Sequence, residues 1–400
     1  MEAYHQLIEF KLTNVGRCPM SNKSIKYLIL TPLLIACSNN PKPFWTNPHL
    51  EACVPRLATT KPLPFSIALN LNRIDASRYD SFYSTRAYTI SKDLEIKDVS
   101  SELLDTNFDG QIGVFVQYAS EEQINVVRMW ENPNHALDEE REGNFNFVDK
   151  YYRWDIYSVK GNEFKNLTKD SVSFYNNGGG VFDNKITYTS IVNNTSVQFK
   201  MDLDGANKVQ LTTTGFVYGY SESKDKQHFA YHSDYKLYID GKKVNTPCNF
   251  NFGPKWAPDS SKLAFICDGK YFQATADGTE VKPLGSRDGL SETVPFMTGY
   301  DFHHGGTDRY DWTSDSNYLV HSKKVNGKAA LVLSNDRDVQ ILTQDLDVSH
   351  PIVKDNYILF HAINSSNKMY DVYIFDLITK ETIQVTNLDA NCNSRYALPF

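Results

Sequence analysis

Short apolar runs preceded by an Asp-containing turn recur along the chain. The stretch 253–266 reads GPKWAPDSSKLAFI: a Trp, then a Pro-Asp-Ser-Ser turn, then an apolar run. The stretch 311–322, DWTSDSNYLVHS, has the same order. A tight turn followed by such a run is typical of a short β-strand. The positions that repeat at equal spacing are Trp256, Asp259 and Leu263 in the first stretch and Trp312, Asp315 and Leu319 in the second.

Looser copies of this element occur elsewhere. The stretch 221–233 keeps an aspartate, Asp225, and an apolar run in register, but it lacks the Trp. The stretches 181–190 and 353–362 are shorter versions, each with an Asp-containing turn before a mostly apolar run. The element therefore repeats, and the pattern indicates β structure.

A second element follows each copy of the first. It consists of a strand, a tight turn and another strand that ends near Leu-Thr. Three of the turns are Asp-Gly pairs, which support the positive φ of the primed turns in β-hairpins. The clearest copies of this second element lie at 155–168, 197–212, 235–246, 271–284, 330–343 and 371–386, with a weaker copy at 87–100.

The repeating unit is thus four short antiparallel strands, recurring every ~40–50 residues, as in the blade of a β-propeller. We predict an all-β fold, a propeller of four-stranded antiparallel blades. The strand-turn-strand endings near 99, 167, 211, 244, 284, 342 and 385 favour seven blades, and six is the alternative. The tail at 393–400 is expected to supply an inner strand to the first blade. A β-sandwich of regular hairpins is the competing all-β fold.

The ordered recurrence of Trp, Asp turn, apolar strand, Asp-Gly hairpin and Leu-Thr over about residues 110–387 resembles the TolB-like propeller family. The resemblance makes Trp256, Asp259, Trp312 and Asp315 the blade signature. It implies a non-catalytic module of the bacterial envelope that binds protein, and usually six blades. TolB itself carries an α/β domain before the propeller. Residues 38–64 are too few for such a domain, which puts the specific role of TolB in doubt.

The N-terminal region has the pattern of an export signal. Lys23 and Lys26 precede the apolar run 27–36, which is too short to span a bilayer as a helix. We predict a signal peptide over residues 20–36, and residues 1–19 are expected to be untranslated or unstructured. A buried apolar strand with a chance Cys is the alternative interpretation.

The end of this run, Leu34-Ile35-Ala36-Cys37, resembles a bacterial lipobox. That resemblance implies cleavage before Cys37 and acylation of its thiol. Ser38 after it implies delivery to the outer membrane, so we expect a lipid-anchored protein on the periplasmic side. Residues 37–64 are rich in Pro and are predicted to be a tether, with the propeller over 65–400.

Composition excludes some classes of partner. The formal net charge is −7 and no basic run occurs, so a nucleic-acid partner is not expected. A mean hydropathy of −0.45 argues against an integral membrane protein, which leaves the lipid anchor as the expected membrane contact. We expect a monomer.

Four cysteines follow Cys37 and, in an exported protein, are candidates for disulfides. Four cysteines allow three pairings. We prefer Cys248–Cys267, across the hairpin at 253–266, together with Cys53–Cys392, which would join the two ends of the mature chain. Cys-x-x-Cys and Cys/His zinc spacings are absent.

Three irregular segments are expected on one face of the propeller. The segment 131–150 lies between the second and third strands of a blade, and 105–113 and 285–309 lie between blades. In a propeller, these two kinds of connection share a face, and long loops are commonly functional. We therefore predict a scaffold that binds an envelope protein or periplasmic ligand through this face. The acidic cluster at 138–142 is interpreted as a solvated loop.

Two segments carry candidate chemistry. Asp105, Asn107 and Asp109 match the first half of a calcium loop, although Val116 stands where the acidic ligand at position twelve is expected. An Asx-rich turn is the alternative, and no other cofactor is expected.

The stretch 302–312 is the second segment. An enzyme of the sugar lyase or hydrolase type would need convergent His, Arg and carboxylate groups, and a polar loop with Gly hinges is the alternative. A serine peptidase is excluded, because Gly-x-Ser-x-Gly is absent. The candidate catalytic residues are His303, His304, Asp308 and Arg309.

Overall fold

The computed structural model describes the part of the chain that follows residue 51, with gaps. Within the described residues every regular element is a β-strand, and no helix able to cross a membrane occurs there. These residues belong to one compact unit, Trp45–Phe400. The described residues are 52–73, 85–101, 103, 113–131, 152–171, 173, 175–182, 184–193, 195–212, 217–284, 310–363 and 369–400.

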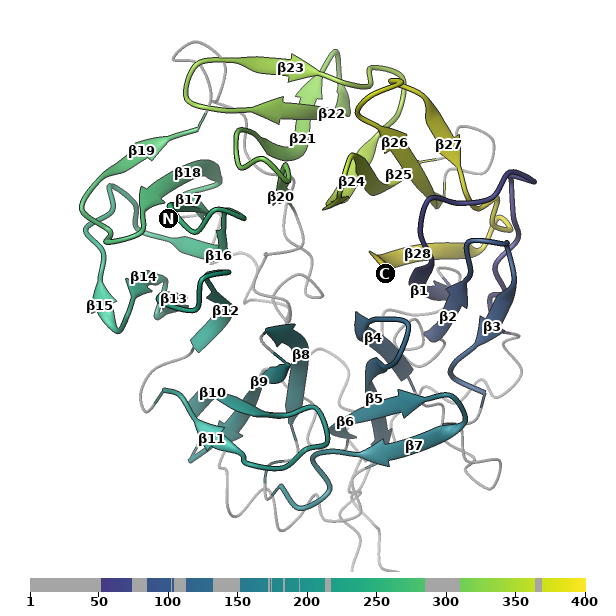
Figure 1. Ribbon diagram of the computed structural model, residues 1–400, viewed down its shortest axis with the longest axis horizontal. Helices are drawn as coiled ribbons and strands as arrows, with labels where there is room; N and C mark the ends of the chain where they lie inside the picture. Colours follow the sequence, from purple (N-terminus) through teal and green to yellow (C-terminus); the bar gives the residue numbers. More distant parts are fainter. Residues whose placement is uncertain are drawn as a thin grey trace, which may run out of the picture. The chain divides into compact units, whose positions relative to one another are not determined.

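The strands form seven four-stranded antiparallel sheets arranged around a common centre (Figure 1). The fold is a β-propeller with seven blades, as favoured from the sequence. The six-bladed and sandwich alternatives were wrong.

We number the blades from the one that contains β1, and name strands first to fourth from the centre outward. Blade 1 contains β28 (Cys392–Pro399), β1 (Ile67–Arg73), β2 (Arg86–Ile90) and β3 (Ile96–Asp98). Blade 2 contains β4 (Gly113–Ala119), β5 (Ile124–Glu131), β6 (Tyr152–Lys160) and β7 (Glu163–Asn166). Blade 3 contains β8 (Asn176–Phe182), β9 (Lys185–Val192), β10 (Thr195–Asp202) and β11 (Val209–Gln210).

Blade 4 contains β12 (Val217–Glu222), β13 (Phe229–Ser233), β14 (Lys236–Ile239) and β15 (Lys242–Lys243). Blade 5 contains β16 (Asn251–Trp256), β17 (Lys262–Cys267), β18 (Lys270–Thr275) and β19 (Val281–Pro283). Blade 6 contains β20 (Tyr310–Trp312), β21 (Leu319–Val325), β22 (Lys328–Ser334) and β23 (Val339–Ile341). Blade 7 contains β24 (Val348–Lys354), β25 (Tyr357–Ile363), β26 (Tyr370–Asp376) and β27 (Thr382–Gln384).

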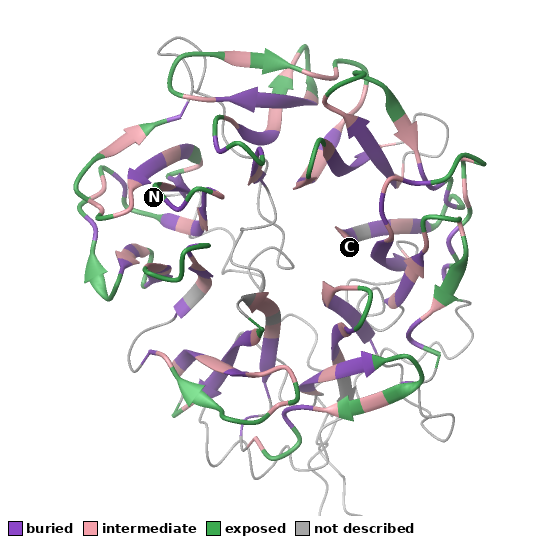
Figure 2. Cartoon of the chain, in the orientation of Figure 1, coloured by how far each residue is buried: buried purple, intermediate pink, exposed green. Residues whose placement is uncertain are grey.

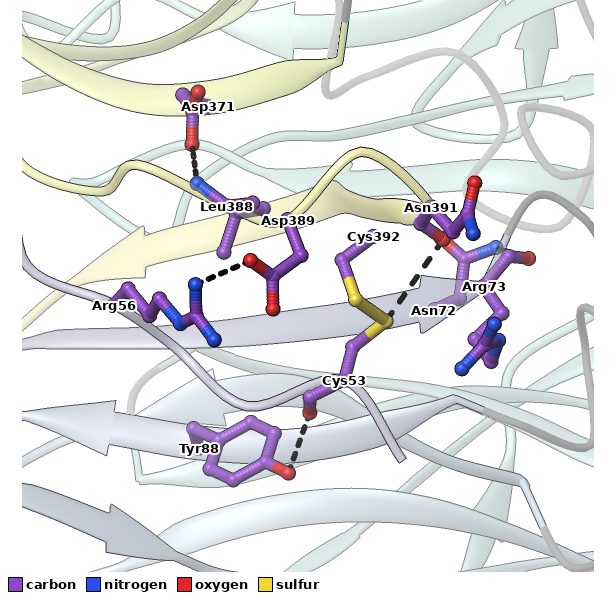
Figure 3. The surroundings of a disulfide bond; sticks show 10 residues. All are labelled: Cys53, Arg56, Asn72, Arg73, Tyr88, Asp371, Leu388, Asp389, Asn391 and Cys392. Atoms are coloured by element: carbon purple, nitrogen blue, oxygen red, sulfur yellow. Dashed lines mark hydrogen bonds and ion pairs between the residues drawn. A yellow bond between two sulfur atoms is a disulfide. The ribbon is translucent and has the colours of Figure 1, made fainter. Parts of the chain in front are cut away.

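The two ends of the propeller meet in blade 1. The C-terminal strand β28 supplies its first strand and pairs antiparallel with β1, from Ile67↔Pro399 to Arg73↔Cys392. The predicted disulfide Cys53–Cys392 is present at this closure, with a Cα–Cα distance of 5.6 Å (Figure 3). Ring closure is therefore both hydrogen-bonded and covalent.

The described part of the predicted tether, residues 52–64, packs on the propeller. The carbonyl of Cys53 accepts a hydrogen bond from the Tyr88 hydroxyl at 2.7 Å, and Arg56 forms an ion pair with Asp389 (Figure 3). Leu57 makes an antiparallel bridge to Thr386. The disulfide therefore joins a segment that already lies against blades 1 and 7.

The second predicted disulfide, Cys248–Cys267, is also present, with a Cα–Cα distance of 5.5 Å. Cys267 ends β17 and lies opposite Asn251 of β16, so Cys248 reaches it from just before the hairpin. Both members of the preferred pairing are confirmed.

Apolar cores lie between adjacent blades, at interfaces that we call seams. Buried residues concentrate in the inner strands of the blades, and exposure increases toward the outer strands (Figure 2). Among the described residues, apolar clusters fill the seams 1–2, 2–3, 4–5, 5–6, 6–7 and 7–1. No such cluster of described residues fills seam 3–4.

The signature Trp residues connect neighbouring blades. The indole N–H of Trp256 donates to Ser221 O at 3.1 Å, and that of Trp312 donates to Lys255 O at 3.0 Å. In each case the acceptor lies at the end of the first strand of the preceding blade. A buried indole needs a partner for its N–H, and the repeat provides one.

Signature Asp residues stabilise the turn that follows the first strand. Asp259 Oδ1 accepts the Ser261 N–H at 3.0 Å, and Asp315 Oδ1 accepts the Asn317 N–H at 3.0 Å. Burial opposes ionisation of Asp315, but hydrogen bonds from Thr313 and Asn317 outweigh it, so its pKa is lowered. The signature aspartates are therefore turn residues.

The Leu-Thr ending also has a structural cause. Thr168 Oγ1 accepts the Ile156 N–H at 3.0 Å and donates to the buried carboxylate of Asp155 at 2.8 Å. Thr386 Oγ1 likewise accepts the Val372 N–H and donates to the Asp371 carboxylate, both at 2.9 Å. The threonine thus joins the outer end of a blade to its third strand.

The prediction that the Asp-Gly pairs form primed turns was only partly correct. Asp240 (φ 50°) and Gly241 (φ 75°) both have positive φ, as a two-residue type I′ turn requires. At 204–205 and 277–278 only the glycine has positive φ, because these pairs lie in longer connections, 203–208 and 276–280.

Candidate functional site

The two faces of the propeller differ in their connections. Turns from first to second and from third to fourth strands are short, from two residues at 183–184 to six at 223–228. We call the face that they share the turn face. Connections from second to third strands and between blades join strand ends on the opposite face, the loop face. The four longest connections all join strand ends there: 74–85, 99–112, 132–151 and 284–309.

The structure places the flanks of the three predicted segments as expected. The segment 131–150 joins β5 to β6, 105–113 joins β3 to β4, and 285–309 joins β19 to β20. All these strand ends lie on the loop face. The candidates His303, His304, Asp308 and Arg309, the calcium candidates Asp105, Asn107 and Asp109, the acidic cluster and Cys37 lie outside the described residues.

Sequence reasoning missed one connection. Strand β1 ends at Arg73 and β2 begins at Arg86, so residues 74–85 join a second to a third strand. A signal was available, because the sequence from 74 to 85 contains Arg78, Tyr79, Phe82 and Tyr83, which are residue types enriched in protein interfaces.

Blades 1 and 2 carry one arginine each in the strands β2 and β5, which lead to the loop face. Arg86 begins β2 and donates to Thr85 O at 3.0 Å, and burial lowers its pKa although Tyr88 and Asp98 oppose this. Arg128 lies over the ring of Tyr157, with Cζ 5.8 Å from the centroid.

Arg153, near the start of β6, is held differently. Its Nε lies 3.0 Å from Asp155 Oδ2, and its Nη2 donates to Ser171 O at 2.7 Å. Asp155 is fully buried and also accepts the Thr168 hydroxyl. A carboxylate so enclosed acts as a structural acceptor and has no room for a substrate.

Three buried histidines are the other titratable groups of interest, and the sequence reasoning did not select them. Burial lowers the pKa of His232 to about 3, that of His321 to about 4 and that of His361 to about 3. His321 Nε2 lies 2.8 Å from Ser334 Oγ, and His361 Nε2 lies 3.0 Å from Ser394 Oγ. The repeated His-Ser dipeptides at 232–233 and 321–322 were the available signal.

In these Ser–His pairs the hydroxyl and the imidazole are as close as a catalytic nucleophile and its base. A substrate, however, has no access to them. His321, His361, Ser334 and Ser394 are all buried. His321 and Ser334 lie on adjacent strands of blade 6, and His361 and Ser394 meet between blades 7 and 1, so a substrate carbonyl could not reach them. We assign them to packing.

The described side chains form no cluster of metal ligands. Within these ranges no group of three or more His, Cys, Asp or Glu residues is placed to hold a metal ion. The calcium prediction concerns residues outside these ranges and stays a prediction.

Comparison with known proteins supports the fold of this chain but assigns it no function. No protein-family model and no curated protein sequence matches the chain. The solved structure of puromycin hydrolase is similar at 11% identity with a TM-score of 0.53, covering 84% of this chain and 54% of that one. This chain therefore spans about half the length of that protein.

Two further solved structures have lower TM-scores. TolB from Acinetobacter baumannii has 13% identity, a TM-score of 0.42 and 78% coverage of both chains. Oligogalacturonate lyase from Vibrio parahaemolyticus has 11% identity and a TM-score of 0.44, covering 83% of this chain and 89% of that one. The predicted fold is confirmed by the structure itself: the chain is a seven-bladed β-propeller.

Proposed function

We propose that the protein is a non-catalytic lipoprotein of the bacterial envelope, whose propeller holds a protein partner on its loop face. The observation that carries the proposal is the asymmetry of the two faces. All four of the longest connections join strand ends on the loop face, whereas the turn face has only short turns. Binding residues concentrate on loops that a rigid scaffold positions.

The composition of these connections supports a protein partner. Their sequences contain many aromatic residues, which dominate the energetics of protein interfaces, and charged residues of both signs. The aromatic residues are Tyr79, Phe82, Tyr83, Phe108, Phe145, Phe147, Tyr151, Phe296, Tyr300 and Phe302.

The anchor would hold the loop face near the membrane. Cys392 begins β28 and lies opposite Arg73, the last residue of β1, so it is at the loop-face end of blade 1. Its disulfide fixes Cys53 at the same end. If Cys37 is acylated, residues 38–51 can span at most about 50 Å. The expected partner is therefore a membrane-proximal envelope protein.

The test is a pull-down from crosslinked envelopes with the lipidated protein as bait. One variant has 132–150 and 285–309 shortened. A control has the turn-face residues 335–338 replaced by Asn-Gly. The proposal expects a partner that is enriched with the intact and control baits and lost with the loop variant.

Equal enrichment with all three baits would overturn the loop-face assignment. If no protein is enriched, the scaffold role fails, and the lyase or hydrolase alternative is then tested with H303A, H304A and R309A. A separate assay addresses the anchor: incorporation of labelled palmitate should be abolished by C37A.

A further inference from the structure

A polar cleft lies on the turn face between blades 5 and 6, opposite the loop face. Its volume is about 430 Å³, within the ~300–1,000 Å³ of ligand pockets. The start of β17 and the hairpin β18–β19 line one side, and the turns of blade 6 at 313–318 and 335–338 line the other. Ala274 is the one apolar residue in the lining, so the cleft favours a polar ligand.

Lys262 has no carboxylate partner among the described residues. Its ammonium lies 4.9 Å from the centroid of the Trp312 ring. That ring is buried, and its N–H is bound to Lys255 O, so the indole is fixed in place. A cation–π contact orients the ammonium but does not neutralise it. An anionic group of a ligand would neutralise it.

The other charges of the cleft are largely paired. Lys282 Nζ lies 3.4 Å from Asp336 Oδ2 and 3.9 Å from Glu280 Oε1, and it spans the seam. Arg337 lies at the mouth with its side chain 88% exposed, and its Nε is 3.9 Å from Asp336. Three cations against two carboxylates leave the lining one positive charge in excess.

The neutral groups of the lining offer hydrogen bonds. Gln273 is only 8% exposed and belongs to the lining of the cleft. Asn335 Oδ1 accepts the N–H groups of Arg337 at 2.9 Å and Asp338 at 2.8 Å, so its Nδ2 donor is oriented and available. Fixed amides of this kind pair with hydroxyl groups.

We propose that this cleft binds a small sugar acid, with the carboxylate at Lys262 and Arg337 and the hydroxyl groups at Gln273 and Asn335. The single excess positive charge favours a monoanion. A phosphate monoester carries about −1.5 to −2 charges and would leave charge uncompensated beside Asp336 and Glu280. The site is separate from the loop face and does not depend on the partner proposed there.

The test is isothermal titration calorimetry of the whole protein with glucuronate, galacturonate, glucose and glucose 6-phosphate. We expect binding of at least one uronate, weaker binding of the sugar phosphate and none of glucose. K262M keeps the aliphatic stem but removes the charge, and R337A removes an exposed side chain. Each should weaken uronate binding by about tenfold or more.

The matched control is K242M on the outer strand of blade 4, which should leave binding unchanged. Uronate binding that K262M and R337A do not affect would overturn the site. Equal or tighter binding of the phosphate would overturn the ligand class. Absence of binding at 10 mM ligand would overturn both.

Discussion

Seams 7–1 and 3–4 lie on different sides of the ring and are built differently (Figure 1). Seam 7–1 has a large apolar cluster, a strand from the C-terminus and a disulfide. Seam 3–4 has no apolar cluster among the described residues. It is joined by the ion pair of Lys200 with Glu222 at 2.7 Å and by the Ser196 hydroxyl, which donates to Val217 O at 3.1 Å.

Blade 4 faces seam 3–4 with a row of stacked aromatic rings. Ala230, Leu237 and Ile239 belong to the apolar cluster of seam 4–5, so the alternate positions of the same strands face blade 3. The row is half-buried, and blade 3 offers it polar side chains, including Gln198 and Lys200. The rings of the row are Tyr220, Phe229, Tyr231 and Tyr238.

The difference indicates where the ring is held and where it opens. Closing a ring from a linear chain costs entropy, and at seam 7–1 the covalent link and the apolar cluster offset it. Seam 3–4 takes no part in that closure and is held by the polar contacts named above. We expect seam 3–4 to open first when stability is lowered.

The largest expected effect is loss of the closing disulfide. The double variant C53S/C392S should lower the free energy of unfolding by about 5 kcal/mol, because the bond closes a loop of 339 residues. C248S/C267S should lower the free energy of unfolding by about 3 kcal/mol, because that bond joins cysteines with a sequence separation of only 19. Urea unfolding of both variants checks the order. A smaller loss for C53S/C392S would contradict the role assigned to the closure.

Acid should weaken seam 7–1 next. His361 has a pKa of about 3 when folded and about 6.5 when unfolded, so below pH 6.5 the unfolded chain takes up a proton that the folded chain does not. The free energy of unfolding should fall by about 1.4 kcal/mol per pH unit for each such histidine, and the contribution is complete above pH 6.5.

Urea midpoints from pH 7 to pH 4.5 measure this slope. H361Q should reduce the slope by the contribution of one histidine, about 1.4 kcal/mol per pH unit. H228Q, on the surface of blade 4, is the comparison variant. An unchanged slope in H361Q would mean that this ring is not buried neutral.

A smaller effect is expected at the polar seam. K200M removes the ammonium group that pairs with Glu222, whose side chain is 11% exposed. Glu222 then keeps one partner, the Tyr220 hydroxyl at 2.7 Å. The cost should be about 1–2 kcal/mol. Hydrogen exchange in β10 and β12 should rise more than in β1 and β28. Equal increases in both pairs would argue against local opening.

The smallest effect should be a gain. T189V/Q198L replaces a buried hydrogen-bonded pair, 2.5 Å between Nε2 and Oγ1, by apolar groups that face the aromatic row. Removing both partners together is near neutral or stabilising, so we expect a gain of up to about 1 kcal/mol. A loss above 1 kcal/mol in thermal or urea unfolding would show that the polar contacts of seam 3–4 stabilise it.

The repeat made the fold predictable. The fourth strands end at Asp98, Asn166, Gln210, Lys243, Pro283, Ile341 and Gln384, each one residue before a predicted ending. Turn residues and alternating apolar positions are local signals, so they can be read from the chain. The disulfides followed because Cys248 and Cys267 flank a hairpin and Cys53 and Cys392 flank the ring.

Other features depend on contacts between distant residues. The pairing of β1 with β28 joins the two ends of the sequence, and only the strand at the C-terminal end was named in advance. The cleft joins Lys262 and Gln273 to Arg337 across a seam, and no local pattern marks that meeting. The polarity of seam 3–4 was equally hidden, because Lys200 and Glu222 belong to different repeats.

Site-specific photocrosslinking in living cells tests the loop-face proposal most directly. A photoreactive residue would replace the exposed Lys270 on the loop face, beside the start of the connection 284–309, in one variant and Asn335 on the turn face in another. We predict a protein adduct of defined mass from the Lys270 position and none from the Asn335 position. An adduct from the Asn335 position alone, or none from either, would contradict a partner held on the loop face.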